Sequence, residues 1–158
     1  MKCVLLDTTY ILPLFGVGVK IPDLREKIIS MAKRYHLLIN SLSILEGKWK
    51  VLKLAKKKPD LIDSFSEGLL FLEHRKIFKI IPFYEYDVDL IATELHYFHN
   101  DYFDCSILAS AFVHADIFAT EEKRNMQNLI RKLPPDYLIY RKVPSDLAIM
   151  KLGEIEIM

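Results

Sequence analysis

Cys3-Val4-Leu5-Leu6-Asp7-Thr8-Thr9 is the stretch that decides the fold of this chain. An unbroken apolar run that stops at an acid and two hydroxyl residues is typical of a buried parallel strand that leads into a helix. Residues 24–31 then carry apolar side chains at helical spacing, and Leu37–Ile39 is a second buried run. The first forty residues therefore predict a strand, a helix and a second strand parallel to the first.

The remaining chain continues this alternation. Apolar spacing, caps and breakers predict further helices at residues 41–56, 60–72, 88–99, 102–114 and 121–132, and further strands at residues 80–82, 117–119 and 137–140. This order predicts an α/β fold of three layers (α/β/α), with a mostly parallel central sheet of four to five strands. We expect residues 1–140 to form the main domain. Residues 141–158 are expected to be a C-terminal extension, with an edge strand or interface segment around residues 154–157.

Composition limits the possible functions. The chain has 158 residues, of which 51% are hydrophobic, so one domain with a substantial core is expected. Lys and Arg (22) nearly balance Asp and Glu (21), so any preference for a polyanion must come from local patches. The apolar runs are too short to span a bilayer. Cys3 and Cys105 lack the spacing of a zinc or redox pair, which predicts buried thiols and a cytoplasmic location.

Several carboxylates are predicted to meet at one edge of the sheet. Asp7 follows the first strand, Glu46 lies on the helix after the second, and Glu121 and Glu122 follow the strand at 117–119. Loops and helix N-termini converge at the carboxyl ends of parallel strands. Clustered carboxylates repel one another unless a cation lies between them, and an all-oxygen donor set suits Mg²⁺ or Mn²⁺. Such ions activate water for phosphodiester hydrolysis, which is the reaction that this pattern favours.

Four short motifs, in this order, resemble a PIN domain of the VapC type. They are Leu6-Asp7-Thr8-Thr9, Ser43-Ile44-Leu45-Glu46, the run from His99 to Ala111 with its Asp101-Tyr102-Phe103-Asp104 core, and Phe118-Ala119-Thr120-Glu121-Glu122. The resemblance covers about residues 1–140. It implies a Mg²⁺- or Mn²⁺-dependent ribonuclease acting on single-stranded or structured RNA. It also implies the toxin role of a VapBC-type pair, with an antitoxin protein as partner, and a homodimer.

The same resemblance implies the roles of individual residues. Asp7, Glu46 and Asp104 would be catalytic metal ligands, and Thr8 or Thr9 and Thr120 would supply hydroxyl contacts. The fourth acidic position of the family is usually Asp, whereas this chain has Glu122, preceded by Glu121. The longer side chain changes the geometry that this position can offer.

Simpler interpretations exist for several of these residues. Asp101 and Asp104 have the spacing of a helix cap and a first-turn acid, and we favour capping for Asp101 and metal binding for Asp104. Glu121 and Glu122 fit a first helical turn as well as they fit a metal site. Lys50, Lys53 and Lys57 form a stripe beyond Glu46 that could follow an RNA backbone, although a solvated helix face explains them better.

Other side chains are assigned ordinary structural positions. Trp49, with Leu45 and Leu52, is predicted to face the core rather than to stack on bases. His96 and His99 could bind a metal or shuttle protons, but surface positions near a helix end explain them better.

Two other functions remain as alternatives. A PIN-like scaffold that is catalytically weak or inactive could bind RNA or protein, and Glu122 in place of Asp supports that reading. A phospho-transfer protein could use Asp7 as a nucleophile, but such proteins usually have a second Asp two residues later, where this chain has Thr9.

Overall fold

The chain folds around a five-stranded, fully parallel sheet. The computed structural model describes residues 1–140 and 146–157. The strand order is β3-β2-β1-β4-β5, so the first strand is central. The strands are β1 (Cys3–Leu6), β2 (His36–Asn40), β3 (Phe78–Ile81), β4 (Ile117–Ala119) and β5 (Ala148–Met150). This arrangement confirms the predicted α/β class and the parallel sheet.

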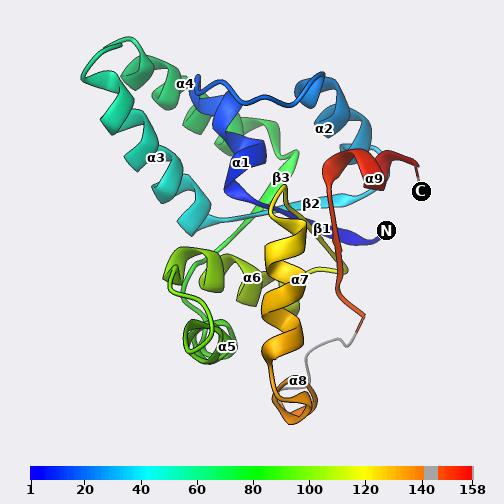
Figure 1. Cartoon of the computed structure of the whole chain (residues 1–158). Coiled ribbons are helices and arrows are strands. Elements are labelled where there is room, and N and C mark those ends of the chain that lie inside the picture. The colour runs from blue at the N-terminus through cyan, green and yellow to red at the C-terminus, as the bar shows by residue number, and fades with distance from the viewer. Residues whose placement is uncertain (141–145, 158) are drawn as a thin grey trace.

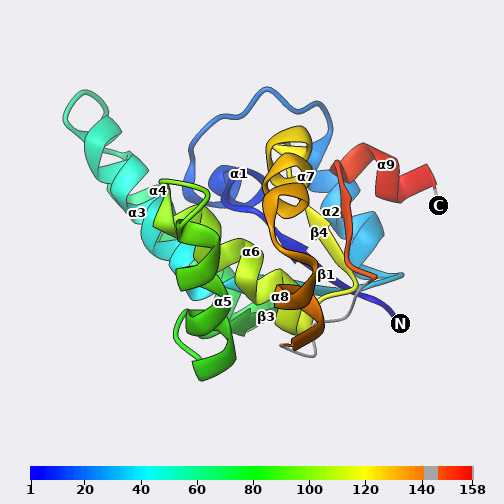
Figure 2. The same cartoon turned by 60° about the horizontal axis from the view of Figure 1, so that its bottom comes forward.

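Helices cover both faces of the sheet (Figures 1 and 2). In chain order they are α1 (Thr8–Ile11), the 3-10 helix η1 (Leu12–Phe15), α2 (Leu24–Ala32), α3 (Ser41–Ala55), α4 (Leu61–Arg75), α5 (Tyr86–His96), α6 (Tyr102–His114), α7 (Lys123–Lys132), α8 (Pro135–Tyr140) and α9 (Leu152–Ile157). In the part of the chain that is described, no helix combines the length and the apolar character needed to cross a membrane.

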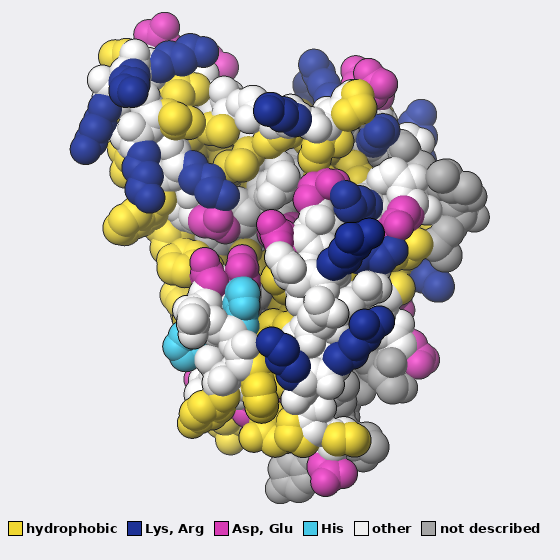
Figure 3. Space-filling view, viewed as in Figure 1, with side chains coloured by type: hydrophobic (Ala, Val, Ile, Leu, Met, Phe, Trp, Pro, Cys, Tyr) yellow, Lys and Arg dark blue, Asp and Glu magenta, His cyan; other side chains and the backbone are white. Residues whose placement is uncertain are grey.

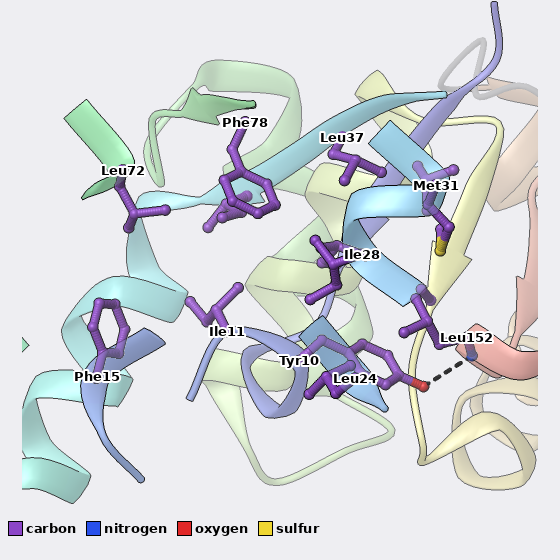
Figure 4. Close-up of a cluster of buried hydrophobic side chains, with 14 of the residues drawn as sticks. Tyr10, Ile11, Phe15, Leu24, Ile28, Met31, Leu37, Leu72, Phe78 and Leu152 are labelled. Atoms are coloured by element: carbon purple, nitrogen blue, oxygen red, sulfur yellow. Dashed lines mark hydrogen bonds between the residues drawn. The ribbon is translucent and has the colours of Figure 1, made fainter. Parts of the chain in front are cut away.

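Alternating side chains of β1 separate two cores. Val4 and Leu6 belong to the cluster formed with α1, α2, α4 and α9, part of which is shown in Figure 4. Leu5, between them, belongs to the cluster formed with α5, α6 and α7. A strand covered on both faces has no solvated side, which explains why residues 3–6 read as a continuous apolar run.

The strand predicted at residues 137–140 is wrong, and so is the edge-strand alternative for residues 154–157. Residues 137–140 lie in α8, which begins at Pro135, because a proline at the first helical position has its fixed φ already suited to a helix. Residues 154–157 lie in α9, from which Ile155 packs fully into the core. The edge strand is instead Ala148–Met150, which continues the sheet beyond β4.

The predicted orientation of Trp49 is also wrong. Its side chain is 60% exposed, and Leu45 and Leu52 are 45% and 47% exposed. The buried residues of α3 include Gly47 and Val51, and the missing side chain at Gly47 admits the ring of Phe15. Because Phe15 packs against Gly47, the side of α3 that carries this glycine faces the core. The apolar side that was predicted to be buried faces solvent. The true outward stripe is Leu45, Trp49 and Leu52.

Candidate active site

Asp7 occupies the carboxyl end of the central strand. Its backbone N–H donates to the carbonyl of Ala119, which continues the β1–β4 pairing by one residue. Its side chain caps α1: Oδ1 accepts from Thr8 N at 2.7 Å, and Oδ2 accepts from Thr120 Oγ1 at 2.8 Å. Asp7 is therefore the N-cap of α1, which does not exclude a second role. Each carboxylate oxygen has two lone pairs, so each can accept a further contact.

Glu46 is carried to the same edge by α3, which begins where β2 ends. Asn40 caps this helix through Leu42 N at 2.7 Å and donates to Ser110 Oγ at 2.5 Å. Thr8 Oγ1 donates to Glu46 Oε2 at 2.6 Å. Lys50 Nζ lies 2.7 Å from Glu46 Oε1. Thr8 thus connects Asp7 to Glu46 through its backbone N–H and its hydroxyl.

Asp104 comes from the first turn of α6. Asp101 caps that helix, accepting from Phe103 N at 2.9 Å and from Asp104 N at 3.3 Å. A crossover helix runs opposite to the parallel strands, so its N-terminus lies at their carboxyl edge. His99 Nε2 lies 3.0 Å from Asp104 Oδ2. Asp101 therefore has the structural role that the sequence favoured, and Asp104 faces the acidic edge.

The electrostatics connect the three carboxylates. The surrounding protein desolvates Asp7 and raises its pKa to about 6, against the lowering effect of its bonds to Thr120 and Thr8. The charges of Asp104 and Glu46 raise it further. Burial also raises the pKa of Asp104, with Asp101 and Glu46 adding to the rise and His99 opposing it. Asp104 and Glu46 therefore repel the charge of Asp7, and Glu46 repels that of Asp104. Acidic side chains gather in the middle of the face shown in Figure 3.

The acids after β4 lie differently. Thr120 is buried, and its Oγ1 both donates to Asp7 and accepts from Glu122 N at 3.0 Å. The Glu122 side chain accepts from Asn125 on the exposed side of α7. No interaction among the described residues joins its carboxylate to Asp7, Glu46 or Asp104. Its catalytic and metal-binding roles stay predictions.

Glu121 is held by the C-terminal segment. Tyr10 OH donates to Glu121 Oε1 at 2.6 Å and accepts from Leu152 N at 3.1 Å, the contact drawn in Figure 4. Lys151 Nζ lies 3.2 Å from Glu121 Oε2. Burial, followed by the bond to Glu121, raises the pKa of Tyr10, so its hydroxyl remains a donor. Glu121 therefore anchors residues 151–152 to the turn after β4.

The oxygen ligands suit a divalent metal, but the described side chains do not form a complete coordination site. Asp7, Glu46 and Asp104 offer only oxygen. The pKa of Asp7 is raised first by burial and then by the charges of Asp104 and Glu46, and a bound cation would favour its charged form. Among residues 1–140 and 146–157, no three His, Cys, Asp or Glu side chains are grouped closely enough to hold an ion. Thr8, Lys50 and His99 engage carboxylate oxygens that a metal would use. Metal binding therefore stays a prediction.

Two contributors to this edge were not found by the sequence analysis. His99 was interpreted as a surface residue, although it lies five residues before Asp104 and touches it across the loop that leads into α6. Tyr10 lies three residues after Asp7, and a buried tyrosine hydroxyl needs a polar partner. That requirement was the only available signal, and it could not identify Glu121 as the partner. The side chain of Thr9 makes no hydrogen bond to other described residues.

A separate pocket opens at the other end of the sheet. It has a volume of about 620 Å³ and is lined by the amino ends of three strands, including Cys3, His36 and Phe78. Parallel strands place their ligand-binding loops at the opposite edge. We therefore assign the candidate active site to the carboxyl edge, where the acids interact, and not to this pocket.

Comparison with known proteins gives a likeness of fold. No family model matches this chain, and no curated protein matches its sequence. Among solved structures, it is similar to a chain of VapBC2 from Rickettsia felis, determined with a DNA fragment from their promoter. The TM-score is 0.58 at 17% identity, covering 93% of this chain and 96% of that chain. The chain therefore has a PIN-like fold of the kind found in VapBC2.

Proposed function

We propose that this protein is a divalent-metal-dependent ribonuclease whose catalytic carboxylates are Asp7, Glu46 and Asp104. The observation that carries the proposal is the desolvated Asp7 at the end of the central strand, with its pKa raised to about 6 by burial and by the neighbouring acids. Keeping such charges together costs stability and gives an unliganded scaffold no benefit. The PIN-like fold supports the same reading.

Each residue has a task that follows from its contacts. Thr120 and the backbone of Thr8 fix both oxygens of Asp7, while the Thr8 hydroxyl fixes Glu46. His99 orients Asp104 through one oxygen. When bound, Mg²⁺ or Mn²⁺ would supply an activated water and neutralise the charge that develops on the phosphate. Asp7, Glu46 and Asp104 would hold it, with Glu122 as a further candidate.

The decisive variant is Asp104→Asn, which keeps the shape of the side chain and removes its charge. We expect RNA cleavage to fall by at least about 100-fold, the upper end of the loss seen when a group that only supports a metal ligand is removed. Asp101→Asn is the matched control, because Asn caps helices as well as Asp. It should cleave RNA within a few-fold of the parent. Equal cleavage by Asp104→Asn and the parent would remove Asp104 from the mechanism.

A second readout does not depend on activity. A bound ion stabilises the folded state, by about 2.7 kcal/mol at one hundred times its Kd. The melting temperature of the parent should therefore rise by several degrees with saturating Mn²⁺, and that of Asp104→Asn should not. A noncatalytic RNA-binding module is the second candidate, favoured by the absence of a finished three-ligand group in the described residues. It gains if Mn²⁺ leaves the parent unchanged while RNA still binds.

A protein partner is part of the proposal. The similar chain was determined as part of VapBC2, and this chain exposes the apolar stripe Leu45, Trp49 and Leu52. Burying such a stripe against an antitoxin-type protein or a second copy would remove apolar area from water. Light scattering that gives a dimer mass for the parent, and a monomer mass for Trp49→Lys, would support a homodimer. A monomeric parent would leave only the antitoxin-type partner.

A further inference from the structure

Helix α7 presents a basic face that the carboxylates do not explain. Its ten residues contain four cations and no acid. Met126 and Leu129 are buried, whereas Arg124, Arg131 and Lys132 are exposed. Steps of about 100° per residue put Arg124 and Arg131, with Asn128, on the side of the helix opposite to the buried pair, and Lys132 at about 90° from it, on the flank. We call Arg124, Arg131 and Lys132 the α7 cations.

Within residues 1–140 and 146–157, the α7 cations have no acidic partner. Their neighbour Lys123 behaves differently, because its Nζ lies 2.8 and 2.9 Å from the two carboxylate oxygens of Glu154. A solvated helix face usually alternates the two signs of charge, which stabilises it through pairs one turn apart. This face has only one sign.

The place of the helix gives these charges a possible use. α7 begins directly after the turn that carries Thr120 and Glu122, and Thr120 binds Asp7. Figure 3 shows acidic side chains in the middle of this face of the molecule, with Lys and Arg side chains over α3 to one side and over α7 to the other. The formal net charge of the whole chain is only +1. On this face, therefore, cations lie on two flanks of an acidic centre, although the chain as a whole carries almost no net charge.

We propose that the α7 cations bind the phosphate backbone of the single-stranded RNA that the acidic edge would cleave, on the opposite side of that edge from Lys50, Lys53 and Lys57. The inference rests on the proposed function and names the path of its substrate. A strand cut at an internal phosphate must continue on both sides of the acids, which repel it. Cations on both flanks offset that repulsion, and a single strand is flexible enough to reach both.

The test measures the salt dependence of RNA binding by the full chain. Binding of a labelled, unstructured RNA oligonucleotide is measured in EDTA, so that metal-dependent cleavage does not interfere, over a series of KCl concentrations. The variant is Arg124→Gln/Arg131→Gln/Lys132→Gln. For single strands, the slope of log Kobs against log [salt] changes by about 0.7 for each phosphate contact. We expect the slope to become shallower by about 2.

The control removes three lysines from the other end of the sheet. Lys2→Gln/Lys33→Gln/Lys79→Gln changes exposed residues before β1, before β2 and within β3, and gives the same net charge as the α7 variant. Its slope should stay within about 0.5 of that of the parent. If the triple variant misfolds by circular dichroism, Arg131→Gln/Lys132→Gln replaces it, with an expected change of about 1.4.

The outcomes separate this inference from the proposed function. An unchanged slope in the α7 variant, or equal changes in variant and control, overturns the inference, and an acidic protein partner then becomes the better occupant of the face. An equal change for a duplex of the same sequence overturns its single-strand part. Loss of cleavage in Asp104→Asn with an unchanged α7 slope retains the nuclease and rejects this path. If the parent never cleaves RNA but the α7 variant shows the shallower slope, the RNA path is retained and the nuclease function is rejected.

Discussion

At the scale of single residues, the site is defined by a carboxylate held where its charge is unfavourable. Asp7 accepts two hydrogen bonds, and its pKa is nevertheless raised to about 6, because the loss of solvent outweighs them. Two neighbouring acids act in the same direction. The charged form of Asp7 is therefore unfavourable in the folded protein, a feature that is common among residues of active sites.

The raised pKa of Asp7 predicts how stability depends on pH. Because the folded pKa of Asp7 lies above the unfolded value near 3.8, the folded state binds the proton more tightly. The stabilisation is complete below about pH 4 and is lost as the pH rises through 6. In EDTA, Asp7→Asn should be more stable than the parent at pH 8, by up to roughly 3 kcal/mol, and this advantage should shrink toward pH 4. Urea denaturation across this pH range measures it. A constant difference between the two proteins would contradict the assignment.

At the scale of helices and strands, the sequence predicted which elements exist more reliably than which side of each element faces the core. Residues 3–6, 37–39 and 117–119 were found because a strand buried on both sides leaves a continuous apolar run. Trp49 was misplaced because apolar spacing identifies a stripe without saying whether the core covers it. The fact that decided its side, the contact of Gly47 with Phe15, joins residues far apart in the chain.

For the candidate site too, the elements that carry the residues were easier to predict than the contacts of the side chains. The positions of Asp7, Glu46 and Asp104 could be inferred, because strand ends and helix starts share one edge of a parallel sheet. The contacts of His99 and Tyr10 could not, because they depend on how loops and side chains pack in three dimensions. The strand predicted at residues 137–140 is wrong for a local reason. Pro135, the second of two successive prolines, begins a helix.

Glycine positions offer a test at this scale. A Cβ at Gly68 of α4 would collide with the carbonyl oxygen of Leu14, a backbone atom that cannot rotate away. We expect Gly68→Ala to lower the free energy of unfolding by about 1–3 kcal/mol, despite the better helix propensity of Ala. Gly153→Ala in α9 is the matched control, since nothing lies within 4 Å of its added methyl group. It should be neutral or slightly stabilising. Equal stability of the two variants would show that α4 and η1 are not in close contact.

At the scale of the whole molecule, the C-terminal segment belongs to the same folded unit as the site. β5 pairs with β4, Leu152 and Ile155 are almost fully buried, and Lys151 and the backbone of Leu152 reach Glu121 and Tyr10. The segment thus connects the edge of the sheet to the turn that carries Thr120. An extension that merely lay on the surface would not share a core with β1.

This integration predicts a global effect of a remote substitution. Leu152→Ala should lower the free energy of unfolding by about 2–5 kcal/mol within a single cooperative transition. Ile29→Ala, which alters an exposed side chain of α2, should change it by less than about 0.5 kcal/mol. Chemical denaturation monitored by circular dichroism measures both. An unchanged midpoint in Leu152→Ala would show that the C-terminal segment detaches independently of the domain.

The central position of β1 also governs how the protein reaches this structure. The hydrogen bond from Thr120 to Asp7 joins residues 113 positions apart, and β1 pairs with β4 across a similar span. Such distant pairings form slowly, because a long loop must close first. A partly folded chain holding only β1, β2 and β3 would present one open side of β1, an apolar edge prone to join another chain. Refolding yield should therefore fall steeply with protein concentration, and the edge that carries Asp7 and Thr120 should be among the last parts of the molecule to assemble.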